Sequence, residues 1–78
     1  MATKSIMVGP DWMKFTDGTQ TASAQVAQGT IEMRDDSVKP KVTDVGHPIS
    51  GWIKVTPPTV AWIRAVGSAK VRFIVTYS

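Results

Sequence analysis

Side chains able to do acid–base or metal chemistry are few in this sequence. His47, the only histidine, follows Asp44 in "TDVGHPIS", an arrangement that would suit a general base and a carboxylate that orients it. The surrounding Gly/Pro turn favours a solvated loop histidine instead. Asp35 and Asp36 are adjacent carboxylates, but Ca²⁺ requires six or more oxygens and the EF-hand spacing is missing. Glu32 and the aspartates cannot be assigned as a glycosidase pair without geometry.

Recognisable catalytic motifs are equally sparse. The sequence contains no GxSxG, Walker loop, GxGxxG or HExxH. It has no cysteine, which excludes disulfides, thiolate zinc sites and cysteine nucleophiles, and a lone histidine does not make an imidazole metal site. We therefore expect a protein that is not an enzyme, with no catalytic residues, no cofactor and no metal.

The C-terminal stretch "VAWIRAVGSAKVRFIVTYS" interleaves basic residues with Trp62, Phe73 and Tyr77, and the net charge is +3. This is the composition of a nucleic-acid-binding surface. The basic residues, however, stand singly along the chain, whereas polyanion binders concentrate them. We interpret them as solvated surface charges, so that nucleic acid is an unlikely partner. The alternative is a small module resembling the OB-fold, which would expose Trp12, Phe15 or Tyr77 beside Lys14, Lys54 or Arg72.

Three tryptophans in 78 residues also need an explanation. Each buries about 150–250 Å² in a core or interface, which is the interpretation we adopt for most of them. Trp12 and Trp52 could instead stack on a sugar, which makes a carbohydrate-binding module a further alternative. Of the three, Trp12 is the one we expect to be exposed if any is, because the N-terminal region is least constrained by strand pairing.

The elements that position these residues are predicted to be strands. In "GTIEMRDD", Ile31 and Met33 alternate with Glu32 and Arg34, and "WMKF" and "GWIKVT" are further short β-type runs separated by Gly/Pro turns. We expect residues 1–78 to form one small all-β domain, an antiparallel β-sandwich or barrel that ends in a C-terminal hairpin.

The predicted hairpin turns at Gly67-Ser68. This register pairs Val66 with Ala69, Arg64 with Val71, Trp62 with Phe73 and Val60 with Val75, and it places all of them on the core face. Arg64, the only charge on that face, would reach solvent at the hairpin tip or pair with Asp44 or Asp36.

The opposite face of the hairpin is predicted to hold Ile63 and Ile74 with small residues and two bases. Because a sheet that is apolar on both faces is normally covered on both, we expect either the N-terminal segment or, preferably, a partner subunit there. A 78-residue chain has a thin core, which also favours a homo-oligomer. No run approaches the ~20 apolar residues that span a bilayer, and the N-terminus lacks a signal-peptide pattern, so we expect no membrane partner.

Residues 1–10, "MATKSIMVGP", contain the apolar run Ile6, Met7 and Val8. Such a segment is able to act as an N-terminal arm that adds a strand to its own sheet or to a neighbouring subunit. It is equally well explained as the first strand of the domain. Our candidate interface residues are Ile6, Val8, Trp12, Ile63 and Ile74.

The second half, "GHPISGWIKVTPPTVAWIRAVGSAKVRFIVTYS", resembles short β-rich proteins encoded near the virion genes of tailed bacteriophages and prophages. The similarity lies in a Gly-rich turn, a Pro-containing loop, an aromatic-hydrophobic-Arg strand and a last strand that ends in Val-Thr. The matching residues are Gly46, Pro57, Trp62, Arg64, Gly67 and 71–76. The resemblance implies a capsid-decorating, head-fibre or tail accessory protein that binds other proteins, in a virion assembled in the host cytoplasm. No catalytic residue is implied.

Overall fold

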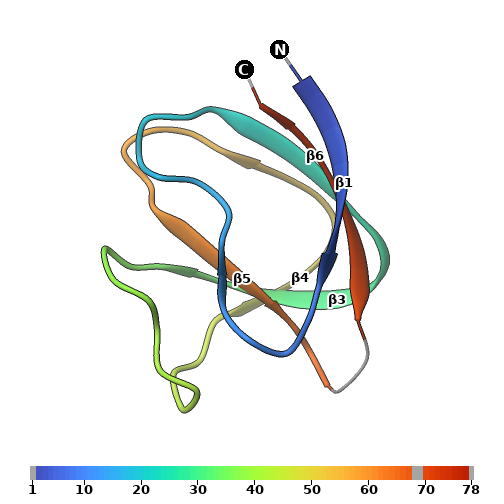
Figure 1. Cartoon of the computed structure of the whole chain (residues 1–78), viewed down its shortest axis with the longest axis vertical. Coiled ribbons are helices and arrows are strands. Elements are labelled where there is room, and N and C mark those ends of the chain that lie inside the picture. The colour runs from blue at the N-terminus through green and yellow to red at the C-terminus, as the bar shows by residue number, and fades with distance from the viewer. Residues whose placement is uncertain (1, 68–69, 78) are drawn as a thin grey trace.

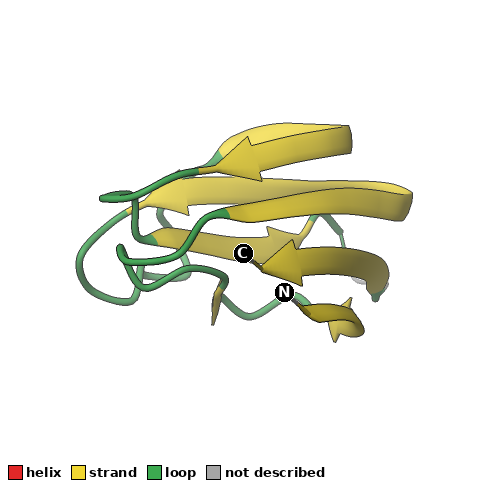
Figure 2. Ribbon diagram, turned by 90° about the horizontal axis from the view of Figure 1, so that it is seen from above, coloured by secondary structure: helices red, strands yellow, loops and turns green. Residues whose placement is uncertain are grey.

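A computed structural model describes residues 2–67 and 70–77 of the chain. These residues form strands and loops without a helix, as expected for an all-β domain. The strands are β1 (Ala2–Val8), β2 (Met13–Lys14), β3 (Ala22–Asp35), β4 (His47–Val55), β5 (Ala61–Ala65) and β6 (Val71–Tyr77). Figure 1 shows them wrapping into a half-barrel, and Figure 2 shows the same strands from above. The described residues contain no helix long and apolar enough to cross a membrane.

All strands belong to one antiparallel sheet, in which β3 is central. One edge of β3 pairs with β4. Its other edge pairs with β6 over residues 22–26 and with β5 over residues 31–35. β6 pairs in turn with β1, and β5 with β2. The sheet therefore has two halves: the first contains β1, β6 and the start of β3, and the second contains β2, β5 and the end of β3.

The predicted C-terminal hairpin is wrong. In the described residues β5 and β6 follow one another along the same edge of β3 instead of pairing with each other. Gly67 does have the positive φ, 88°, that the expected turn needs, whereas Ser68 and Ala69 lie outside the described residues. The connection thus carries the chain from one half of the sheet to the other. A single bent sheet is also a different arrangement from the two packed sheets of a sandwich.

The bend is visible in β3 itself. Between Val26 and Ile31 the register with β4 shifts, and Gly29 in this interval has φ 86°. A residue with a Cβ adopts this left-handed conformation only at a cost, so glycine permits the strand to change direction here. The two halves of the sheet then face each other across the core.

The core fills the inside of the bend. Phe73 of β6 meets Phe15, which follows β2, edge to face with ring centroids 5.0 Å apart. The Tyr77 hydroxyl donates a hydrogen bond to the Phe15 carbonyl at 2.8 Å, which ties the two halves together. Small residues let the strands approach closely. The buried alanines are Ala22, Ala24, Ala61 and Ala65.

The predicted faces are correct for β6 and wrong for β5. Val71, Phe73 and Val75 point into the core as expected. In β5, however, Ile63 is fully buried in the core, whereas Trp62 and Arg64 lie on the outer side of the sheet. The expected Trp62–Phe73 pair therefore does not form. The core covers one face of β5 and the loop at 36–46 covers the other, so the alternation of its apolar side chains did not reveal which face pointed to the core.

Candidate functional site

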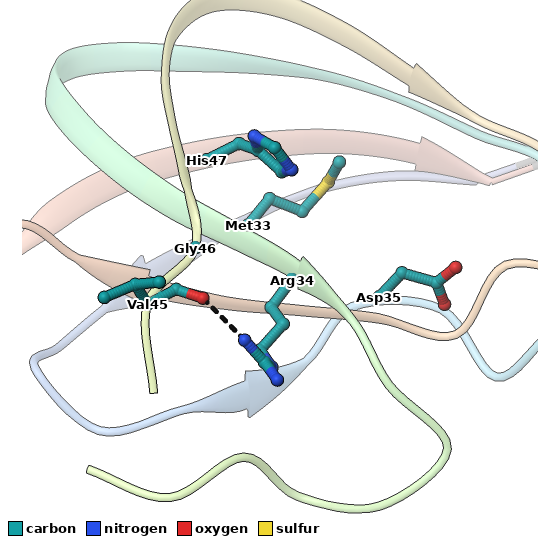
Figure 3. Close-up of a pocket in the computed structure, with 6 residues that line it drawn as sticks. All are labelled: Met33, Arg34, Asp35, Val45, Gly46 and His47. Atoms are coloured by element: carbon teal, nitrogen blue, oxygen red, sulfur yellow. Dashed lines mark hydrogen bonds between the residues drawn. The ribbon is translucent and has the colours of Figure 1, made fainter. Parts of the chain in front are cut away.

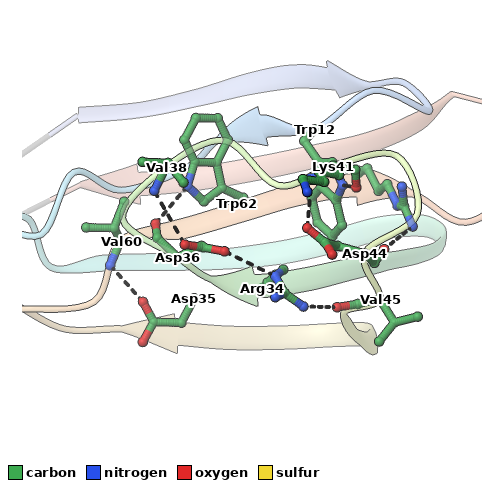
Figure 4. Close-up of polar contacts among 11 residues, drawn as sticks. Trp12, Arg34, Asp35, Asp36, Val38, Lys41, Asp44, Val45, Val60 and Trp62 are labelled. Carbon is green, nitrogen blue, oxygen red and sulfur yellow. Dashed lines mark hydrogen bonds and ion pairs between the residues drawn. The ribbon is translucent and has the colours of Figure 1, made fainter.

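The loop that joins β3 to β4, residues 36–46, covers the outer face of the second half of the sheet (Figure 4). Two buried tryptophans hold it. The Trp62 indole N–H donates to the Asp36 carbonyl at 2.9 Å, and the Trp12 indole N–H donates to the Lys41 carbonyl at 3.0 Å. Because each ring is packed and its only donor is used, both tryptophans fix the loop in place. We call residues 36–46 the clamped loop.

Arg64 is the second fastening. Its Nε pairs with Glu32 Oε1 at 3.0 Å, and its two terminal nitrogens donate to the Val42 and Asp44 carbonyls at 2.9 and 2.8 Å. The guanidinium also lies over the Trp12 ring, 4.3 Å from its centroid. The fork of donors in one planar group can bind a carboxylate and two carbonyls at once. Arg64 is thus a structural residue, although its acidic partner is Glu32 and not the predicted Asp36 or Asp44 side chain.

Glu32 completes this contact from β3, where it lies directly opposite Arg64 in the sheet register. Its second oxygen accepts the Gly46 N–H at 3.1 Å. This backbone hydrogen bond, together with Arg64, lowers the pKa of Glu32 below its ordinary value although partial burial opposes the shift. The chain passes β3 closely at this point, since a Cβ on Gly46 would lie 2.9 Å from the Met33 carbonyl oxygen.

A second group of side chains beneath the clamped loop again combines a tryptophan with basic residues. Trp62 lies between Lys14 of β2 and Arg34 of β3 in the sheet register. The Lys14 ammonium is 5.5 Å from the Trp62 ring centroid. Arg34 donates to the Val45 carbonyl at 2.8 Å and pairs with Asp36 at 3.4 Å. Aromatic and charged side chains together therefore form a small second core outside the sheet.

The clamped loop presents three valines to solvent. Val38, Val42 and Val45 are 66%, 76% and 73% exposed. Their backbone is held by the contacts above, so the side chains stand outward from a fixed loop. Sequence reasoning missed this feature, although one signal was present: valine recurs in "SVKPKVTDV", a polar, Pro-containing stretch where a solvated loop has no need of it.

An open pocket of about 590 Å³ lies beside the end of the clamped loop (Figure 3). Its lining residues come from the end of β3, the last residues of the clamped loop and the start of β4, and they are Met33, Arg34, Asp35, Val45, Gly46 and His47. The Asp44 carboxylate, which the sequence offered as a group that could orient His47, accepts the Lys41 backbone N–H at 2.8 Å instead, and His47 is exposed. The Asp35 and Asp36 carboxylates have different partners: Asp35 accepts the Val60 N–H, and Asp36 forms an ion pair with Arg34. Within residues 2–67 and 70–77, no three acidic or histidine side chains cluster as a metal site.

The predicted interface residues are dispersed. Val8, Trp12 and Ile63 are buried within this chain, so they do not present a surface to a partner. Ile6 is half-buried and packs against the core from β1, which forms the first strand of this sheet by pairing with β6. Ile74 is half-buried on the outer face of β6 and does not share a face with Ile63.

The exposed aromatic residue is Trp52, not Trp12. Trp52 is 71% exposed on β4, whereas Trp12 is 4% exposed beneath the clamped loop. Phe15 is buried, and Tyr77 is half-buried with its hydroxyl bound. The rings required by the OB-like alternative are therefore unavailable for stacking on bases.

No protein-family model, curated protein or solved structure matches the chain.

Proposed function

We propose that this chain is a non-catalytic structural protein of a tailed-bacteriophage or prophage virion, which decorates the capsid or serves as a head-fibre or tail accessory. It binds another virion protein through the clamped loop. The phage assignment follows from the sequence resemblance alone. The binding mode is supported by one observation, the three exposed valines on a loop that is held in place from the side of the sheet.

The fastening favours binding because an ordered loop loses little conformational freedom when a partner docks. Each valine that becomes buried contributes roughly 1.5–3 kcal/mol at most. Contacts of this kind act between protein surfaces and need no cofactor. The chain would assemble in the host cytoplasm with a capsid or tail protein, or with copies of itself as a homo-oligomer.

The test uses heads and tails from the phage or prophage whose genome carries the chain. The wild-type protein should co-sediment with one of these particles. The V38S/V42S/V45S variant should bind at least about tenfold more weakly, because it loses apolar contact area. Its fold should persist, since the carbonyls that Trp12, Arg64 and Arg34 bind are main-chain atoms.

The matched control is M7S/V66S, which removes exposed apolar side chains outside the clamped loop. This variant should bind as the wild type does. The proposal fails if the wild-type chain binds neither heads nor tails. The role of the clamped loop fails if the triple variant binds normally, or if the control loses as much affinity as the triple variant.

A further inference from the structure

The outer face of the first half of the sheet carries an exposed tryptophan. Trp52 lies opposite Gln25 in the β3–β4 register, and Gln25 lies opposite Ile74 of β6. Its neighbours Ile53 and Val55 point inward, so the Trp52 ring stands on the solvent side of β4. We call this surface the Trp52 face. It belongs to the half of the sheet that the clamped loop does not cover.

Neutral hydrogen-bonding groups make up much of this face, beside the apolar Met7 and Ile74. Ser23 and Gln25 of β3 are half-buried beside Trp52, and Thr3 and Thr76 bond to each other through their hydroxyls at 2.8 Å. The complete set of neutral polar residues in the registers that point outward is Thr3, Ser5, Ser23, Gln25 and Thr76. Side chains of this kind can both donate and accept hydrogen bonds.

The charge on the Trp52 face has one sign. Lys54 follows Trp52 by two residues on the same side of β4, and Arg72 lies on the outer side of β6. All six acidic residues of the chain fall between residues 11 and 44 and outside the strands of the first half. Among the described residues, ion pairs engage Arg34, Lys39 and Arg64, and none reaches Lys54 or Arg72. The face is therefore complementary to an anion.

We infer that the Trp52 face binds an acidic polysaccharide, one that carries a carboxylate on some of its sugars. The indole ring offers an electron-rich face on which the C–H bonds of a pyranose can stack. Gln25 and Ser23 are placed to exchange hydrogen bonds with the sugar hydroxyls. Lys54 and Arg72 supply the positive charge for the carboxylates.

Two other occupants fit this face less well. Single-stranded nucleic acid carries a charge on each nucleotide and is held by successive rings in a basic groove, whereas this face has one exposed ring and two bases. A second copy placed face to face would set Lys54 and Arg72 against like charges without an acid to neutralise them. A ligand rich in hydroxyls and sparse in charge matches the composition of the face.

Trp52 also supplies the readout, because Trp12 and Trp62 are buried and Trp52 is exposed. Tryptophan emission should change when the full chain is titrated, at about 50 mM salt, with oligosaccharides of hyaluronan or polygalacturonate. Neutral cello-oligosaccharides should bind more weakly. Oligo(dT) of similar length should bind no better than the neutral sugars.

Variants then assign the contacts. W52A should bind the acidic oligosaccharides roughly tenfold more weakly, as measured by calorimetry. K54Q/R72Q should reduce binding of the acidic sugars to the level of the neutral ones. K39Q/K41Q is the matched control, since it removes two exposed lysines from the clamped loop and should bind as the wild type does. All of these side chains are exposed, so circular dichroism should show an unchanged fold.

The inference is overturned if the wild type binds neither acidic probe at millimolar concentration, or if W52A binds as tightly as the wild type. Tighter binding to oligo(dT) than to the acidic sugars would assign the face to nucleic acid instead. An equal loss in K39Q/K41Q and K54Q/R72Q would mean non-specific charge attraction. Each of these results is separate from particle binding by the clamped loop.

Discussion

Replacing Arg64 with alanine should destabilise the whole domain, because this side chain joins three segments. It bonds Glu32 of β3 and two carbonyls of the clamped loop, and it covers the Trp12 ring. Without it, the Glu32 carboxylate retains the Gly46 N–H but loses its countercharge. The clamped loop would keep its contacts with the two tryptophans, with Arg34 and, through Gly46, with Glu32.

The expected loss follows from these contacts. Two hydrogen bonds to carbonyls contribute about 1 kcal/mol each, the ion pair with Glu32 about 1 kcal/mol, and the contact with Trp12 about 0.5–1 kcal/mol. Since neighbouring contacts are not additive, we expect a loss of about 2–4 kcal/mol. A domain of this length has a total stability of about 4–12 kcal/mol, so Tm should fall by roughly 10–25 °C.

Urea and thermal unfolding followed by circular dichroism will measure the free energy of unfolding. Arg72→Ala is the control, because Arg72 is exposed and should change stability by less than about 0.5 kcal/mol. Arg64→Lys keeps the charge without the planar fork and should recover only a small part of the loss. A loss for Arg64→Ala of less than about 1 kcal/mol, with unchanged proteolysis of the clamped loop, would refute the structural role of this residue.

Three further outcomes are expected. Trp62→Ala should cost ~3–5 kcal/mol, because it removes a large buried ring and the hydrogen bond to the Asp36 carbonyl; an unfolding free energy within about 1 kcal/mol of wild type would contradict this. Gly46→Ala should cost ~1–3 kcal/mol, since its Cβ would press on the Met33 backbone, and denaturant unfolding will measure it; a neutral effect would mean that the loop moves aside freely. The lowered pKa of Glu32 means that its stabilising contribution is complete above its ordinary value of 4.5 and disappears as the pH falls through the folded-state pKa. Glu32→Gln should therefore flatten the acid side of a stability–pH profile, and an unchanged profile would show that Glu32 does not titrate with unfolding.

Much of the local structure was predictable from residue patterns. Ile31 and Met33 face the core while Glu32 and Arg34 face outward, as their alternation predicted, because successive side chains of a strand point to opposite sides. The inward face of β6 was predicted by the same rule, and the β-type run at 51–56 lies within β4 up to Val55, although that strand begins earlier, at His47. These features depend only on the geometry of one strand.

The candidate site was less predictable. Arg64 was singled out as an unusual charge on a strand, but its partner was misassigned because Glu32 became its neighbour only through the pairing of β3 with β5. Trp12 was expected to be the exposed tryptophan if any was, but it is buried, since the loop that covers it lies 29 residues away in sequence at Lys41. The clamped loop and its exposed valines were not predicted at all.

The sequence by itself determined that the chain is β-structured and which residues share a face at 31–34 and in β6. Only the tertiary structure decided which strands pair, which side of β5 faces the core and what the clamped loop covers. The physical reason is that alternation has a period of two residues and is the same whichever strand lies alongside. Partner choice depends on contacts between distant segments, such as the edge of β3 that β5 and β6 share, and these form only when the whole sheet bends around its core.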